Sequence, residues 1–73
     1  MTDKLPLLSG QEIINALKRS GYYIKRQKGS HIRLYHPNRL PVTVPNHSEV
    51  DRKTLKSILH TSNLTIEEFK QLI

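Results

Sequence analysis

Arg26-Gln27-Lys28-Gly29-Ser30-His31-Ile32-Arg33 lies near the middle of the chain and decides the predicted fold. Lys28-Gly29 predicts a tight turn between two segments of strand character, because glycine adopts the positive φ that such turns often need. His31 follows this turn, and an imidazole can gain or lose a proton near neutral pH. The stretch therefore predicts a β-hairpin with a candidate functional residue at its end.

The segment after the turn, residues 30–36, alternates between apolar and polar side chains. This period of two is typical of a strand with one buried face. Ile32 and Leu34 are predicted to face the core. The residues predicted to face outward are His31, Arg33 and Tyr35. The alternation thus predicts that the histidine shares an exposed face with an arginine.

Two further strands are predicted beside this one. Before the turn, residues 22–27 are rich in aromatic and β-branched residues, with Tyr22 and Ile24 on one face and Tyr23, Lys25 and Gln27 on the other. Pro37-Asn38-Arg39 predicts a second turn. Pro41-Val42-Thr43-Val44-Pro45 predicts a short third strand, bounded by prolines that cannot donate to a sheet. The three strands form an antiparallel meander.

Helices are predicted on both sides of the strands. Ser9-Gly10-Gln11-Glu12 has the spacing of a capping box and predicts a helix over about residues 10–20, with Gly21 just beyond its end. Asp51 is the predicted N-cap of a second helix, although Ser48 is an alternative start. Residues 61–63 end that helix. Thr65-Ile66-Glu67-Glu68 is a second capping box and opens a short last helix.

The predicted order is helix, three strands, helix and short helix, an α+β fold. Packing the helices on one face of a three-stranded antiparallel sheet is the economical arrangement. Double-stranded-RNA-binding domains have the same α-β-β-β-α order, although fold alone does not give function. We expect residues 1–73 to form one domain, with the apolar segment Leu5-Pro6-Leu7-Leu8 packed on the core.

The charge of the chain is unevenly placed. Twelve Lys and Arg against six Asp and Glu give a formal charge of +6. No acid occurs between Glu12 and Glu49, whereas seven cations do: Lys18, Arg19, Lys25, Arg26, Lys28, Arg33 and Arg39. A positive field in mid-chain favours a polyanionic partner such as RNA. A solvated sheet face and an acidic protein partner are the alternatives.

Several classes of protein are not expected from this composition. The chain has no cysteine, and its four histidines form no close repeat, so neither a metal site nor a cofactor is predicted. The scarcity of acids in mid-chain argues against a two-metal nuclease. No apolar run is long enough for a membrane span. Met1-Thr2-Asp3-Lys4 lacks the apolar block of a secretory signal, so we expect a cytoplasmic protein.

The motifs together resemble the HicA family of toxins from toxin–antitoxin pairs. The resemblance covers nearly the whole chain and includes Ser9-Gly10-Gln11-Glu12, the Gly-Ser-His signature at Gly29-Ser30-His31, and Val42-Thr43-Val44-Pro45-Asn46-His47. It continues through Thr54-Leu55-Lys56-Ser57-Ile58-Leu59 and a last helix of the Ile-x-Glu-Glu-Phe type. The chain departs from the family at Lys53-Thr54, where HicA proteins often have Gly-Thr.

The resemblance implies a type II toxin that acts as an mRNA interferase, has a double-stranded-RNA-binding-like fold and is neutralised by a HicB-type antitoxin. It also implies that the histidine of the Gly-Ser-His motif, His31, is catalytic. A non-catalytic RNA-binding module and a pure protein-interaction domain are the other interpretations of the basic chain.

The chemistry expected of such an enzyme is metal-independent cleavage of RNA by its own 2′-hydroxyl. His31 is the hypothesised general base or acid, with Lys28 and Arg33 as phosphate contacts or transition-state supports. The further candidates for RNA contact are Arg26, Ser30 and Tyr35, the last by stacking on a base.

The other three histidines have structural roles as alternatives. His47 is a possible second acid or base, but it could equally cap the second helix or satisfy a loop carbonyl. His36 shares the face of Ile32 and Leu34, which favours a structural role. His60 lies late in the second helix, where a charged imidazole suits the helix dipole.

Overall fold

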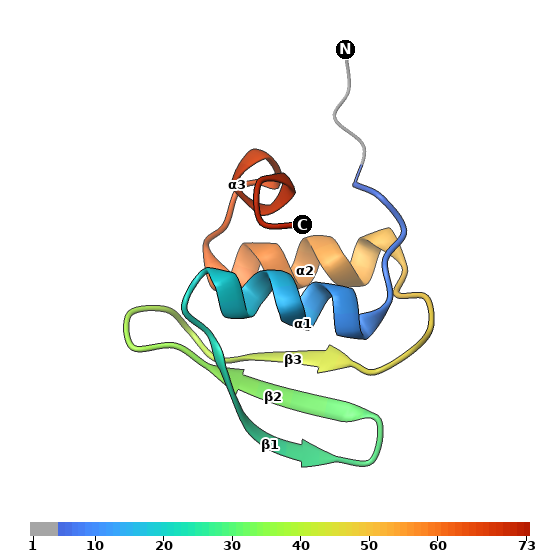
Figure 1. Cartoon of the computed structure of the whole chain (residues 1–73), viewed down its shortest axis with the longest axis vertical. Helices are drawn as coiled ribbons and strands as arrows, with labels where there is room; N and C mark the ends of the chain where they lie inside the picture. The colour runs from blue at the N-terminus through green and yellow to red at the C-terminus, as the bar shows by residue number, and fades with distance from the viewer. Residues whose placement is uncertain (1–4) are drawn as a thin grey trace.

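The computed structural model describes residues 5–73 and has helices on one side of a small sheet. The elements in chain order are α1 (Gly10–Arg19), β1 (Tyr23–Lys28), β2 (His31–Tyr35), β3 (Val42–Pro45), α2 (Arg52–Ser62) and α3 (Ile66–Lys70). Both strand pairs are antiparallel, in the order β1-β2-β3. Figure 1 shows α1 and α2 together on one side of the strands. The predicted α+β fold of the double-stranded-RNA-binding type is confirmed.

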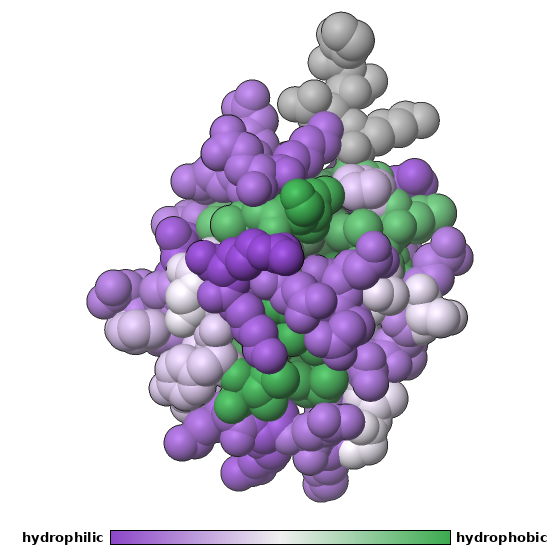
Figure 2. All heavy atoms as spheres, viewed as in Figure 1, coloured by the Kyte–Doolittle hydropathy of each residue, from purple (hydrophilic) through white to green (hydrophobic). Residues whose placement is uncertain are grey.

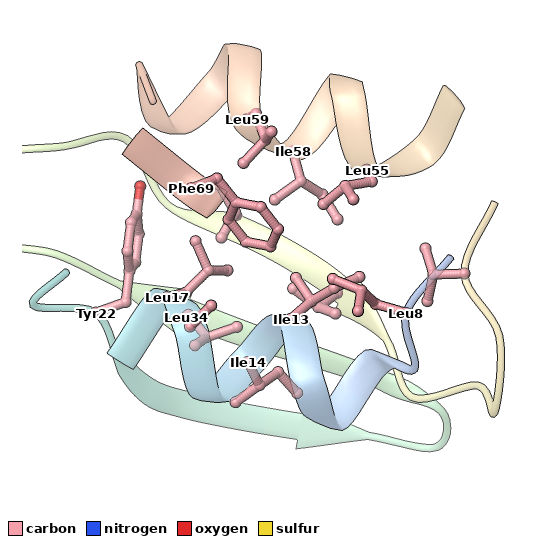
Figure 3. Packing of buried hydrophobic residues seen from close by; sticks show 14 of the residues in the cluster. Leu8, Ile13, Ile14, Leu17, Tyr22, Leu34, Leu55, Ile58, Leu59 and Phe69 are labelled. Carbon is pink, nitrogen blue, oxygen red and sulfur yellow. The ribbon is translucent and has the colours of Figure 1, made fainter. Parts of the chain in front are cut away.

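The hydrophobic core lies between the helices and the inner face of the sheet. Ile32 and Leu34 of β2 are 4% and 0% exposed, as the alternation predicts. Phe69 of α3 is fully buried among side chains from α1 and α2, which holds the short last helix to the core (Figure 3). Burying a side chain of this size stabilises the fold by about 1.5–3 kcal/mol.

Helix α1 begins directly against the end of β3. Its predicted capping box is present, with Ser9 Oγ accepting from the Glu12 N–H and the Glu12 carboxylate accepting from the Ser9 N–H. The Gly10 N–H donates to the His47 carbonyl at 2.8 Å. A Cβ at Gly10 would collide with the Pro45 carbonyl, so this close approach requires glycine.

Helix α2 is closed at both ends by polar contacts. Asp51 is its N-cap, as predicted, and Asn63 is its C-cap in the left-handed conformation. The Arg39 guanidinium donates to the Ser62 and Asn63 carbonyls at 2.8 and 3.0 Å. These bonds satisfy acceptors that a helix end leaves without partners and join the β2–β3 connection to α2.

Two sequence predictions need correction at the start of the chain and at the hairpin. Leu5 and Leu8 are buried, but Leu7 is 47% exposed, so only part of that segment packs on the core. The prediction drawn from residues 1–4, that they lack a secretory signal, concerns residues outside the described part of the chain. Lys28 is the last residue of β1, so the loop consists of Gly29 and Ser30 rather than Lys28 and Gly29.

None of the helices in the described part of the chain is long and apolar enough to cross a membrane.

Strand β1 also departs from the predicted alternation. Its register shifts between Ile24 and Arg26, so the pairs beyond that point are Arg26 with Arg33, Gln27 with Ile32 and Lys28 with His31. Residues directly opposite each other lie on the same face. Gln27 therefore faces the side of Ile32, not that of Tyr23 as predicted. All six residues of β1 are exposed, because this edge strand extends beyond the cover of the helices (Figure 1).

The Gly29-Ser30 loop has a positive φ, +59°, at its first residue alone. This pattern matches a type II′ turn, whose twist suits a two-residue hairpin. A Cβ at Gly29 would meet nothing within 4 Å, so the need for glycine comes from the backbone conformation and not from crowding.

We therefore expect Gly29→Ala to lower the free energy of unfolding by about 1–2 kcal/mol, because L-residues other than Asn and Asp are strained at this φ. Gly29→Asn should cost less, since Asn is, with Gly and Asp, a residue commonly found at the positive-φ positions of such turns. Urea unfolding of the two variants and the wild type checks this. Equal stability of Gly29→Ala and wild type would contradict it.

Two helix N-termini are capped by carboxylates, so the protein is expected to lose stability in acid, where these groups become protonated. The backbone N–H of Thr54, donating to the Asp51 carboxylate at 2.6 Å, lowers the pKa of Asp51 below its ordinary 3.8. The backbone N–H of Thr65 likewise lowers the pKa of Glu68 below its ordinary 4.5. Because both pKa values are lower in the folded protein, each ionised carboxylate stabilises the fold at pH values above its ordinary pKa. This stabilisation is lost as the pH falls through the pKa that the carboxyl has in the folded protein.

We expect the midpoint of thermal unfolding to fall as pH decreases below about 4.5, and to fall less steeply in Asp51→Asn, which keeps a good N-cap but cannot titrate. Melting curves between pH 6 and pH 2 measure this. Ser48→Asn, on the same loop and without a titrating group, is the control. An unchanged pH slope in Asp51→Asn would rule out the cap as a cause.

Candidate active site

His31 begins the central strand and lies on the face of the sheet opposite the helices. Its Cα pairs with that of Lys28 on one side and that of Pro45 on the other. The side chain is exposed, whereas its neighbour Ile32 is buried. Within residues 5–73 the imidazole has no hydrogen-bond partner in the protein. A ring placed in this way is free to exchange a proton with a ligand.

Three predicted cationic residues join His31 on this outer face. Lys28 lies directly across from it, and Arg33 is two residues further along β2, about 7 Å away along the strand. Arg26 lies opposite Arg33 because of the register shift in β1. The strands carry no acid, so no acid of the sheet itself neutralises these cations. In Figure 2 hydrophilic residues form the lower border of the molecule, where the strands lie.

The Arg33 guanidinium is oriented by the neighbouring strand. Its Nη1 donates to Thr43 Oγ1 of β3 at 2.9 Å. One hydrogen bond uses part of a group that has five donors. The remaining N–H groups can bind an anion above the sheet, on the same face as His31.

A depression lies further along the outer face, at the distal end of the β1–β2 pair. It measures about 480 Å³ and is lined by Lys25, Arg26, Arg33 and Tyr35. The Lys25 ammonium lies 5.9 Å from the centre of the Tyr35 ring, within the range of a cation–π contact. The Tyr23 and Tyr35 rings are 6.5 Å apart and inclined by 52°. Tyr35, predicted to stack on a base, is thus in contact with two side chains of the protein itself.

Lys25 was not among the predicted site residues. Strict alternation places it with Tyr23, but no feature of the sequence indicates that Arg26 lies on the same face. The one signal in the sequence for a shared face is the pair Lys25-Arg26, because two consecutive cations interrupt the alternation of that strand.

Ser30 and His47 are held in different surroundings. The Ser30 carbonyl accepts from the Asn46 N–H at 2.6 Å, which ties the hairpin loop to the end of β3. The exposed His47 side chain borders a separate depression of about 260 Å³. Its possible role as a cap of α2 is wrong, because Asp51 caps that helix. Lys28 pairs with His31, and Arg33 lies two residues further along the same strand, whereas His47 lies in the loop after β3 and pairs with no residue of β2.

His36 is confirmed as a structural residue. Its Nδ1 accepts from the Asn38 N–H at 2.9 Å, so its Nε2 carries the proton and donates to the Ser20 carbonyl at 3.0 Å. The ring also meets the Tyr22 ring edge-on at 4.9 Å. These contacts join the end of β2 to the end of α1.

The remaining histidine, His60, is exposed in the last turn of α2. In the part of the chain that the structure describes, no three His, Cys, Asp or Glu side chains gather as a metal site would require. Metal-independent chemistry stays a prediction.

Comparisons with known proteins agree with this architecture. The family model described as the HicA toxin of bacterial toxin–antitoxin systems matches residues 10–64. Among solved structures, the chain is similar to one from a toxin–antitoxin complex of Streptococcus pneumoniae, with 28% identity and a TM-score of 0.69 over 78% of this chain and 98% of that one. No curated protein matches. The matched model spans most of the chain and includes all three strands and α2, and the protein therefore belongs to the HicA toxin family.

Proposed function

We propose that this protein is a toxin that cleaves mRNA as a metal-independent endoribonuclease in the cytoplasm, with His31 exchanging the proton. The observation that carries the proposal is the position of His31, which is exposed at the end of the central strand, opposite Lys28 and two residues from Arg33, in a sheet whose strands contain no acid. Membership of the HicA toxin family supports the assignment.

The proposed reaction uses a nucleophile that RNA itself carries. The ribose 2′-oxygen forms a bond to the adjacent phosphorus, the bond from phosphorus to the 5′-oxygen breaks, and the products are a 2′,3′-cyclic phosphate and a 5′-hydroxyl. His31 takes the proton of the 2′-hydroxyl or delivers one to the leaving oxygen, a contribution of about 10²–10⁴-fold. Water or His47 completes the other proton transfer.

The neighbouring cations act on the phosphate. Lys28, directly across from His31, and Arg33, on the same strand, hold the phosphate oxygens as negative charge builds up in the transition state. Arg33 suits this task because Thr43 holds its guanidinium in place. Ser30, in the hairpin loop, is next to His31 in the chain and contacts the sugar-phosphate backbone of the same RNA.

We also propose that an acidic antitoxin of the HicB type inhibits the toxin by covering the His31 face. The similar chain from Streptococcus pneumoniae comes from a toxin–antitoxin complex, which supports a partner of this class. A face with several cations and no acid favours a partner of opposite charge, through both attraction and faster association.

We expect His31→Ala to reduce cleavage of a single-stranded RNA by about 10²–10⁴-fold while the affinity for that RNA changes less than threefold. Cleavage of end-labelled RNA in EDTA and binding by fluorescence anisotropy measure the two quantities. His60→Ala, an exposed histidine on the helical side, is the control and should behave as wild type.

The same assay separates the rival functions. A substrate with 2′-deoxyribose at the scissile position should resist cleavage, and its cleavage would refute the 2′-hydroxyl route. Binding without cleavage by the wild-type protein would identify a non-catalytic RNA-binding module. An absence of salt-dependent RNA binding would identify a protein-interaction domain instead.

The antitoxin surface makes a separate prediction. We expect Arg33→Glu to slow association with an acidic antitoxin of the HicB type by about tenfold or more, because it reverses a charge at the centre of the proposed contact. Lys56→Glu, on the exposed side of α2, is the matched charge control. Stopped-flow or surface plasmon resonance gives the association rates. Equal rates for the two variants would place the antitoxin elsewhere.

A further inference from the structure

The register shift in β1 brings two consecutive cations to the same face of the sheet. In a regular strand, Lys25 and Arg26 would point to opposite sides. Here Arg26 lies opposite the outward-facing Arg33, while the Lys25 ammonium lies over the ring of Tyr35, which is also outward-facing. Bulges of this kind redirect a side chain and often lie beside functional sites.

The charges that result are unfavourable for the fold alone. Arg26 and Arg33 are directly opposite each other, and like charges in that relation destabilise a sheet. Lys25 adds a third cation to the same depression. No acid of the strands compensates them. A local conflict of this kind is expected where a ligand supplies the missing charge.

The depression is better suited to a phosphate than to a base. The Tyr35 ring has the Lys25 ammonium over it and the Tyr23 ring beside it. A base would have to displace the ammonium in order to stack there. The cation–π contact instead holds the Lys25 ammonium beside Arg26 and Arg33, as one wall of an anion site.

We propose that Lys25 and Arg26, with Tyr35 positioning Lys25, form a binding subsite for an RNA phosphate neighbouring the one that is cleaved, and that Arg33, which lies between His31 and this depression, contacts both phosphates. Arg33 lies about 7 Å along β2 from His31, and Tyr35 about 13 Å. An extended RNA strand following β2 therefore places one phosphate at His31 and another in the depression. The inference rests on the proposed function for the identity of the cleaved phosphate, but not for the anion site itself.

The site is tested with Lys25→Gln in a His31→Ala background, using a single-stranded RNA oligonucleotide as the probe. Loss of one phosphate contact should reduce the slope of log affinity against log salt by about 0.7. Lys56→Gln, an exposed lysine on α2, should leave the slope unchanged. In the protein with His31 intact, Lys25→Gln should raise KM several-fold and change kcat less than twofold.

A chemical change in the RNA tests the same contact from the other side. Replacing single phosphates by neutral methylphosphonates should weaken binding at one position beside the cleavage site, and that loss should disappear in Lys25→Gln. If Tyr35→Leu weakens binding without changing the salt slope, and no methylphosphonate effect depends on Lys25, the ring stacks on a base and the phosphate subsite is wrong.

The outcomes distinguish this inference from the proposed function. A wild-type protein that cleaves no RNA, with Lys25→Gln still reducing the salt slope, would refute the nuclease and keep the anion site. Cleavage that depends on His31, with Lys25→Gln indistinguishable from Lys56→Gln in slope, affinity and KM, would keep the nuclease and overturn the subsite.

Discussion

Burial of one face of β2 is the constraint on which the rest of the structure depends. The helices cover Ile32 and Leu34, and the period of two in a strand then forces His31, Arg33 and Tyr35 to the opposite face. A slip of one residue would bury the histidine and expose the leucine. The hydrophobic core of this small protein thereby positions the imidazole, and its stability and its candidate active site are set by the same register.

The contacts at the ends of the strands keep that register in place. Gly10 lets α1 approach the end of β3, and the Ser30 carbonyl ties the hairpin loop to Asn46. At the far end, His36 joins β2 to α1 through Ser20, while Arg39 joins the next connection to α2. The acceptor in each of these hydrogen bonds is a backbone carbonyl, so the bonds fix the path of the main chain. The outer face is left free of them, except for the bond from Arg33 to Thr43.

Strand β1 combines weak support from the core with a high density of charge. It is an edge strand with no buried residue, so register there is not imposed by a hydrophobic face. The bulge and the cations Lys25, Arg26 and Lys28 also discourage pairing with the edge of another sheet. A surface of this kind is adapted to a polyanion, because the charges that prevent aggregation are those that attract phosphate.

The sequence by itself determined the order of the elements, both capping boxes, the N-cap at Asp51 and the outward direction of His31, because these depend on local spacing and on the period of the strand. Only the tertiary structure decided the face of Arg26 and Gln27 and the contact of Lys25 with Tyr35. A bulge is a property of two paired strands, and the register of β1 is not imposed by a buried face. Neither condition is visible in the alternation of a single segment.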